Sequence, residues 1–174
     1  MKKITNLLMA AFVLSASMSL ASCSKDEKKD DPTSTPTESA TYAFNYMNRT
    51  LEPGQTVYFH PTAEQMANDW AIVEFMLENK SSEEQMTYMK VERIGGPSSF
   101  DNLTICFGES CKIGTCPWTS DEFVLVPGVN SEMPISVEYS PSTAASENGL
   151  YRITIGKGSN LADPQVMMLD MAAN

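Results

Sequence analysis

The stretch WAIVEFMLEN, residues 70–79, decides the fold class of this chain. Every second residue in it is apolar: Ala71, Val73, Phe75 and Leu77. Side chains of a β-strand point alternately to the two faces of a sheet, so this period of two predicts a strand with one buried face. Glu74 and Glu78, at the intervening positions, predict that the other face meets water, as is common in antiparallel sheets.

The same alternation recurs on both sides of this stretch. Residues 86–94 place Met89 and Val91 on one face, and the polar residues 80–85 before them are expected to form a hairpin turn. A short helix is expected at residues 62–68. Further strands are expected at residues 42–47, 56–59, 103–107, 123–126, 133–139, 150–155 and 165–171. Eight or nine strands at spacings near a dozen residues, with almost no helix, predict an antiparallel β-sandwich.

The amino terminus has the order of a secretory signal. Lys2 and Lys3 precede an apolar stretch at residues 4–20, and small residues then lead to Cys23. The apolar stretch is short for a bilayer span. We therefore expect residues 1–22 to be a signal peptide.

The run Leu-Ala-Ser-Cys at residues 20–23 resembles the bacterial lipobox. The resemblance implies cleavage before Cys23 and lipidation of its thiol and amino group, with palmitate among the acyl chains. Two or more acyl chains hold a protein firmly, so Cys23 would be the whole membrane anchor.

Residues 23–40 are expected to be a disordered tether. Ser24 to Asp31 is strongly charged, and residues 32–39 are rich in Pro, Thr and Ser, so this segment cannot bury a core. The run Ser-Lys-Asp-Glu at residues 24–27 is similar to the acidic export signal of Bacteroidetes surface lipoproteins. That resemblance implies an outer-membrane protein facing the cell exterior, while a periplasm-facing location stays open.

The charge of the chain argues against a nucleic-acid partner. The formal net charge is −10, from 12 Lys and Arg against 22 Asp and Glu. Proteins that bind the phosphate backbone need the opposite sign.

Residues 41–174 are expected to form one domain. The segments 75–83, 91–94, 105–108 with Cys111, 123–128 and 149–154 are, in this order, similar to the immunoglobulin-like β-sandwich domain common in exported proteins of Bacteroidetes. The resemblance implies an immunoglobulin-like fold and a non-catalytic module for binding, spacing or assembly at the cell envelope. No enzyme activity and no cofactor are expected. The partner is an unspecified envelope protein or a glycan, and the alternative function is a glycan-binding accessory of a polysaccharide uptake system.

Three cysteines follow Cys23, in the pattern Cys-x4-Cys-x4-Cys: Cys106, Cys111 and Cys116. In an exported protein the first interpretation is a disulfide, and the sequence alone allows three pairings. The family resemblance implies a pair between a strand end and the following loop, which favours Cys106–Cys111, with Cys106–Cys116 as the rival. The spacing is not a usual one for zinc, and no metal site is expected.

Trp118 lies in the cysteine loop and is the candidate ligand contact, because braced loops at the ends of sandwiches carry function. Its alternative role is a lid over the core. Trp70 begins a core strand and is expected to be structural. His60, the only histidine, is expected at the surface or a strand end, since no G-x-S-x-G motif accompanies it. The methionines are scattered and are expected to fill the core rather than bind copper.

Overall fold

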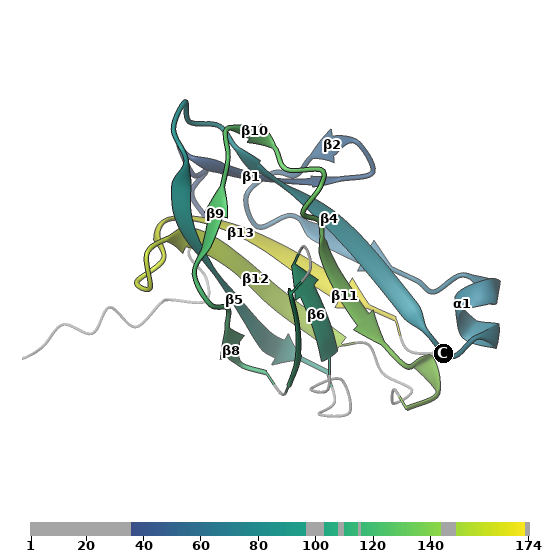
Figure 1. The fold of residues 1–174 in the computed structure, drawn as a ribbon. Coiled ribbons are helices and arrows are strands. Elements are labelled where there is room, and N and C mark those ends of the chain that lie inside the picture. Colours follow the sequence, from purple (N-terminus) through teal and green to yellow (C-terminus); the bar gives the residue numbers. More distant parts are fainter. Residues whose placement is uncertain (1–35, 97–102, 108–109, 115, 144–148, 173–174) are drawn as a thin grey trace, which may run out of the picture. The chain divides into compact units, whose positions relative to one another are not determined.

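The computed structural model describes residues 36–96, 103–107, 110–114, 116–143 and 149–172. The expected signal peptide, Cys23 and most of the expected tether lie outside the described residues. Residues 35–174 form one compact unit, and its described part consists of two facing β-sheets (Figure 1). Among the described residues, no helix has the length and apolar character needed to cross a membrane.

The first sheet is seven-stranded, in the order β2-β1-β4-β11-β6-β7, and β10 also pairs with β4. All of its pairings are antiparallel. Its strands are β1 (Tyr42–Tyr46), β2 (Arg49–Thr50), β4 (Ala71–Asn79), β6 (Leu103–Phe107), β7 (Ser110–Gly114), β10 (Gly128–Val129) and β11 (Ile135–Tyr139).

The second sheet is six-stranded, in the order β3-β13-β12-β5-β8, and β9 also pairs with β5. Its strands are β3 (Thr56–Phe59), β5 (Gln85–Gly95), β8 (Trp118–Thr119), β9 (Phe123–Leu125), β12 (Gly149–Lys157) and β13 (Ala162–Met171). Only the β3–β13 pair is parallel among these pairings. The described helices are α1 (Ala63–Ala67) and a 3-10 turn at Pro141–Thr143. The prediction of an all-β, immunoglobulin-like sandwich is confirmed.

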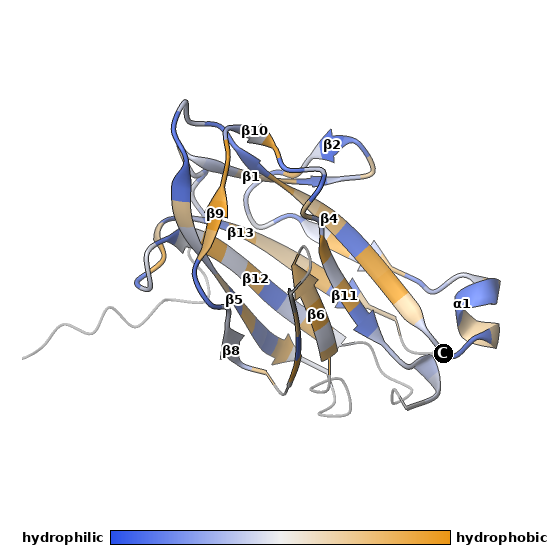
Figure 2. Ribbon diagram, viewed as in Figure 1, coloured by the Kyte–Doolittle hydropathy of each residue, from blue (hydrophilic) through white to orange (hydrophobic). Residues whose placement is uncertain are grey.

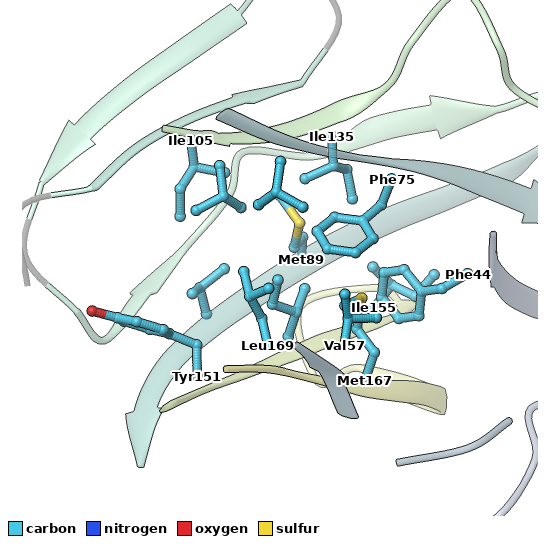
Figure 3. Close-up of a cluster of buried hydrophobic side chains, with 14 of the residues drawn as sticks. Phe44, Val57, Phe75, Met89, Ile105, Ile135, Tyr151, Ile155, Met167 and Leu169 are labelled. Carbon is cyan, nitrogen blue, oxygen red and sulfur yellow. The ribbon is translucent and has the colours of Figure 1, made fainter. Parts of the chain in front are cut away.

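The core lies between the sheets, where the alternating apolar residues of the strands meet. Phe75, Ile105 and Ile135 of the first sheet face residues of the second sheet, among them Ile155, Met167 and Leu169 (Figure 3). Hydrophobic and hydrophilic residues alternate along much of β12 (Figure 2). In β4 it is burial that alternates, since its inward residues are buried and the residues between them are half-buried or exposed. The predicted inward residues of the strand at 70–79 are all buried: Ala71, Val73, Phe75 and Leu77.

The expected hairpin at residues 80–85 is wrong. β4 and β5 belong to different sheets, so this segment crosses from one sheet to the other. Buried Asn79 shapes the crossing, because its side-chain amide donates to Glu83 O at 2.8 Å and to Leu125 O at 2.9 Å, while its Oδ1 accepts from Ser81 N at 3.0 Å. Periodicity reveals which face of a strand is buried but not which strand is its neighbour.

The described end of the expected tether, residues 36–40, makes hydrogen bonds to the domain. Ser39 N donates to Oε1 of buried Gln165 at 3.0 Å. The Asp163 carboxylate accepts from the N–H groups of Ala40 and Thr41, each at 3.0 Å. Lys80 contacts this segment as well, through the Ser39 carbonyl and an ion pair with Glu38. These polar partners come from distant parts of the chain, so the polar composition of residues 36–40 could not reveal the docking.

Replacing Asp163 by Asn should lower the free energy of unfolding by about 1 kcal/mol at neutral pH. An ionised carboxylate accepts stronger hydrogen bonds than a neutral amide does, and the loss stays this small because Asp163 is partly exposed to solvent. Partial burial by itself would raise the pKa of Asp163, but hydrogen bonds from Thr41, Ala40 and Ser39 outweigh it and lower the pKa. Because the pKa of Asp163 is lower in the folded state than in the unfolded state, the ionised carboxylate stabilises the fold. This stabilisation is complete above the unfolded-state pKa, about 3.9, and is lost as the pH falls through the folded-state pKa. Chemical denaturation of both proteins between pH 2.5 and 7 tests this, and a difference that persists unchanged to the lowest pH would contradict it.

Candidate functional site

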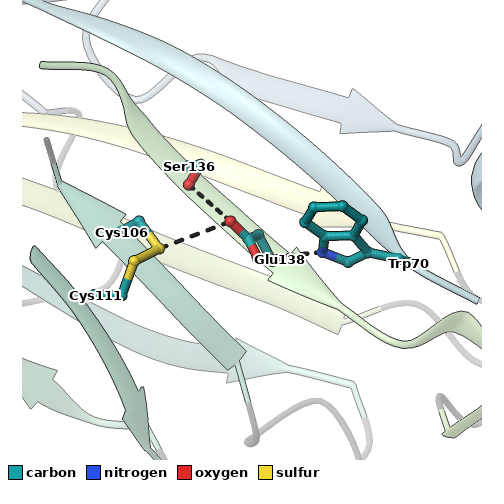
Figure 4. Close-up of a disulfide and its surroundings, with 5 residues drawn as sticks. All are labelled: Trp70, Cys106, Cys111, Ser136 and Glu138. Atoms are coloured by element: carbon teal, nitrogen blue, oxygen red, sulfur yellow. Dashed lines mark hydrogen bonds between the residues drawn. A yellow bond between two sulfur atoms is a disulfide. The ribbon is translucent and has the colours of Figure 1, made fainter. Parts of the chain in front are cut away.

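Trp70, directly before β4, is the more exposed of the two tryptophans. Trp70, which was expected to be structural at the start of a core strand, is 57% exposed and lies outside the core. Its indole Nε1 donates to Glu138 Oε2 of β11 at 3.2 Å, so the ring has a polar partner on the sheet although it faces solvent (Figure 4). The sequence indicated this exposure, because alternate residues of a strand point to the same face. Residue 70 therefore shares a face with outward-facing Glu74 and not with Ala71.

The segment before β4 fixes the Trp70 backbone. Helix α1 starts with a capping box, in which Gln65 N donates to Thr62 Oγ1 at 3.2 Å and Thr62 N donates to Gln65 Oε1 at 2.9 Å. Trp70 N then donates to Gln65 O at 3.0 Å. Asp69, which has a φ of 50°, accepts from Ser142 N and Ser140 Oγ, each at 2.7 Å. Hydrogen bonds from Ser142 and Ser140 lower the pKa of Asp69, so this carboxylate beside Trp70 is ionised at neutral pH.

Both carboxylate oxygens of Glu138 have contacts, since Oε2 accepts from the indole and Oε1 faces Ser136 and Cys106. Its Oε1 accepts from Ser136 Oγ at 3.2 Å and lies 3.7 Å from Cys106 Sγ (Figure 4). Strands β11 and β6 place these side chains together, since Ser136 lies opposite Cys106 in the ladder. The carboxylate is therefore positioned by the sheet and keeps the tryptophan in place.

A groove of about 680 Å³ lies beside the same part of β4. Strand β1 ends at Tyr46 with a tight turn at Met47 and Asn48, both with positive φ, so no described strand pairs with residues 72–74 of β4 on that side. Gln65 Nε2 occupies part of the gap and donates to Ile72 O at 3.1 Å. The polar side chains that line the groove include Asn45, Asn48, Gln65 and Glu74.

The disulfide is Cys106–Cys111, as the sequence analysis favoured. Its position differs from the expectation in one respect: Cys111 lies in strand β7 directly opposite Cys106, and not in a loop. The bond thus joins the two strands at the edge of the first sheet. Cys116 is outside this bond and is half-buried against the core.

Peptide mapping without reduction should recover Cys106 linked to Cys111 and should find Cys116 alkylated after denaturation. Cleavage after Glu109 and Lys112 separates the three cysteines into different peptides, so the linkage is read directly. A linked peptide that contains Cys116 would contradict the assignment. Reduction of a bridge that closes so short a loop should lower the free energy of unfolding by about 2 kcal/mol.

Trp118, the candidate ligand contact, is half-buried in β8, where it lies opposite Val91 of β5 and packs against the core. It also lines a narrow, mostly apolar cleft of about 100 Å³. The rings of Phe107 and Phe123, 4.1 Å apart between centroids, form part of the same cleft. The structure therefore does not bring Trp118 together with the exposed face of β4.

The other candidates are dispersed. His60 is exposed at the end of β3. Met89, Met167 and Met171 are buried in the core, whereas Met47 is 76% exposed. The described residues contain no group of three or more His, Cys, Asp or Glu side chains that could hold a metal ion.

The fold defines an immunoglobulin-like β-sandwich, with an exposed tryptophan and a groove on one sheet. No protein-family model matches the sequence, and no curated protein matches it. Among solved structures, the N-terminal domain of PorA is similar with a TM-score of 0.54 and 16% identity, over 75% of this chain and 96% of that chain. The CooA pilin subunit of enterotoxigenic Escherichia coli aligns with a TM-score of 0.42 and 12% identity, over 77% of this chain and 99% of that chain. At such low identities the likeness to the PorA domain concerns the fold alone.

Proposed function

We propose that this protein is a lipid-anchored, non-catalytic binding module of the bacterial cell envelope. Residues 1–22 direct export, Cys23 carries the lipid, and the segment from Ser24 to Asp31 directs the protein to the outer face of the outer membrane. The support for these steps is the order of motifs at the amino terminus. Residues 36–40 dock onto β13 through Gln165 and Asp163, which gives the tether a defined attachment to the second sheet.

The observation that carries the binding role is the outer face of β4. There Trp70 is exposed and bonded to Glu138, and Ile72, Glu74 and Met76 of the same face line a groove of about 680 Å³. Large, fixed aromatic side chains at the surface are typical of recognition sites, because they bury much area at a small cost in conformational entropy. Sheet faces that serve only stability do not need such a residue.

Protease shaving of intact cells tests the location. With an epitope tag at the carboxyl terminus, we expect added protease to remove the tag while a periplasmic marker stays intact. A matched variant in which Lys25, Asp26 and Glu27 are all replaced by Ala should keep its lipid and become protected. Protection of the wild-type tag until the cells are lysed would contradict the surface location, and a Cys23→Ala variant that stays in the membrane fraction would contradict the anchor.

Cross-linking tests the binding role separately. A photoreactive residue at Met47, beside the groove, should capture a defined species, and one at Tyr58 on the second sheet should not. The two positions are comparably exposed, at 76% and 69%. Equal and unspecific labelling from both positions would contradict a binding face on β4.

A second candidate function is glycan capture as an accessory of a polysaccharide uptake system. The exposed indole of Trp70, bordered by Glu138, is the observation that favours it.

A further inference from the structure

We propose that the outer face of β4 binds a short segment of a neutral glycan, with one sugar ring stacked on Trp70. This inference rests on the proposed function as a binding module and names the ligand class and its site. The site is made of Trp70, directly before β4, and of Ile72, Glu74 and Met76 in β4, with the amide of Asn48 at the groove.

The surroundings of Trp70 favour a sugar over an apolar protein surface. The ring is bordered by polar groups, since its N–H is bonded to Glu138 and the adjacent Asp69 is bonded to Ser140 and Ser142. Hot spots in protein interfaces are usually surrounded by contacts that exclude water. A pyranose ring has one apolar face of C–H groups and a rim of hydroxyls, which matches an aromatic ring with a polar border.

The groove continues the site along the strand. Alternate residues of a strand point to the same face, so Ile72, Glu74 and Met76 follow Trp70 in one row. Six residues of strand span about 20 Å, which is long enough for several sugar rings. Ile72 and Met76 supply apolar area, and the amide of Asn48 and the carboxylate of Glu74 can donate to or accept from hydroxyls.

The charge of this face selects a neutral ligand. Asp69, Glu74, Glu78 and Glu138 all lie on or beside it, and neither β4 nor β11 contains a Lys or Arg. Exposed Arg49 of β2, directly after Asn48, offsets only part of this negative charge. Uronic, sialic or sulfated sugars would meet like charges, which costs binding free energy.

The test uses the full chain, purified in detergent, on an array of neutral and acidic polysaccharides and oligosaccharides. We expect signals from a set of related neutral glycans and none from acidic ones. For the glycan with the strongest signal, titration calorimetry should show binding at least about tenfold weaker for Trp70→Ala, the range expected for loss of a stacking residue. Trp70→Phe should retain part of the affinity.

The control variant is Tyr58→Ala, which removes an exposed aromatic ring from the second sheet and should bind as the wild type does. Melting curves confirm that each variant is folded. Three outcomes would each overturn the glycan site. They are wild-type affinity in folded Trp70→Ala, a preference for acidic glycans, and the absence of any neutral glycan bound on the array. If a photoreactive residue at Met47 still captures a defined envelope protein in that case, the proposal of a binding module stands and only the glycan is wrong.

Discussion

Replacement of Phe75 by Ala is expected to lower the free energy of unfolding by about 3–5 kcal/mol, the usual range for removing a buried aromatic ring. Phe75 is 1% exposed and lies between the two sheets (Figure 3). Its ring contacts that of Tyr46, with 5.3 Å between centroids. The alanine variant would lose the buried apolar area and leave a cavity that the surrounding strands cannot fill completely.

Urea titration of the full chain measures this effect, and Glu74→Ala is the matched control. Glu74 is the preceding residue of the same strand and points to the opposite, exposed face, so its replacement should change stability by no more than about 0.5 kcal/mol. Similar losses for the two variants would mean that β4 does not present these faces to core and solvent as the structure has them.

Gly156→Ala is the second replacement with a large expected effect, about 1–3 kcal/mol of destabilisation from overpacking. A Cβ at residue 156 would lie 2.6 to 2.8 Å from the C, Cα and O atoms of Leu161. These are backbone atoms at the turn between β12 and β13, where the pairing register is irregular between Ile155 and Lys157. The turn would have to open, because a backbone cannot rotate away as a flexible side chain does.

Gly95→Ala is the control for this effect. A Cβ at residue 95 would lie 3.4 Å from Leu150 Cβ, which is close to an ordinary contact with a side chain. Thermal unfolding should therefore give a melting temperature near that of the wild type for Gly95→Ala and a clear drop for Gly156→Ala. Two equal shifts would contradict the close approach of Leu161.

The positions of most long strands could be predicted because burial acts on each strand locally. In residues 71–77 and 151–155, every second side chain faces the core, because one face of the strand is buried and the other is solvated. The sequence shows this as an apolar residue at every second position. The strands that were missed are the two-residue β2, β8 and β10 and the five-residue β7. The two-residue strands are too short to show a period, and β7 has no alternating buried side: Cys111, Lys112 and Ile113 are all exposed.

The candidate site was only partly foreseeable. The sequence directed attention to Trp118, because it is close to the cysteines, but this residue packs against the core. Trp70 was expected to be structural because it begins a core strand, although residue 70 alternates with the buried residues of that strand and so points outward. Its partner Glu138 is 68 residues away, and no local pattern reveals such a contact.

By itself, the sequence determined the two-faced strands, and hence the sandwich, since hydrophobic burial requires an apolar residue at every second position. It also contained the motifs at the amino terminus from which export and a lipid anchor are proposed. Only the tertiary structure decided which strands are neighbours: the crossing at residues 80–85, the strand that carries Cys111, and the docking of residues 36–40. The physical reason is that hydrogen bonds between backbones are nearly independent of residue type. Partners far apart in the chain are therefore chosen by the packing of the whole domain, and the groove beside β4 exists because β1 turns away from β4 after Tyr46.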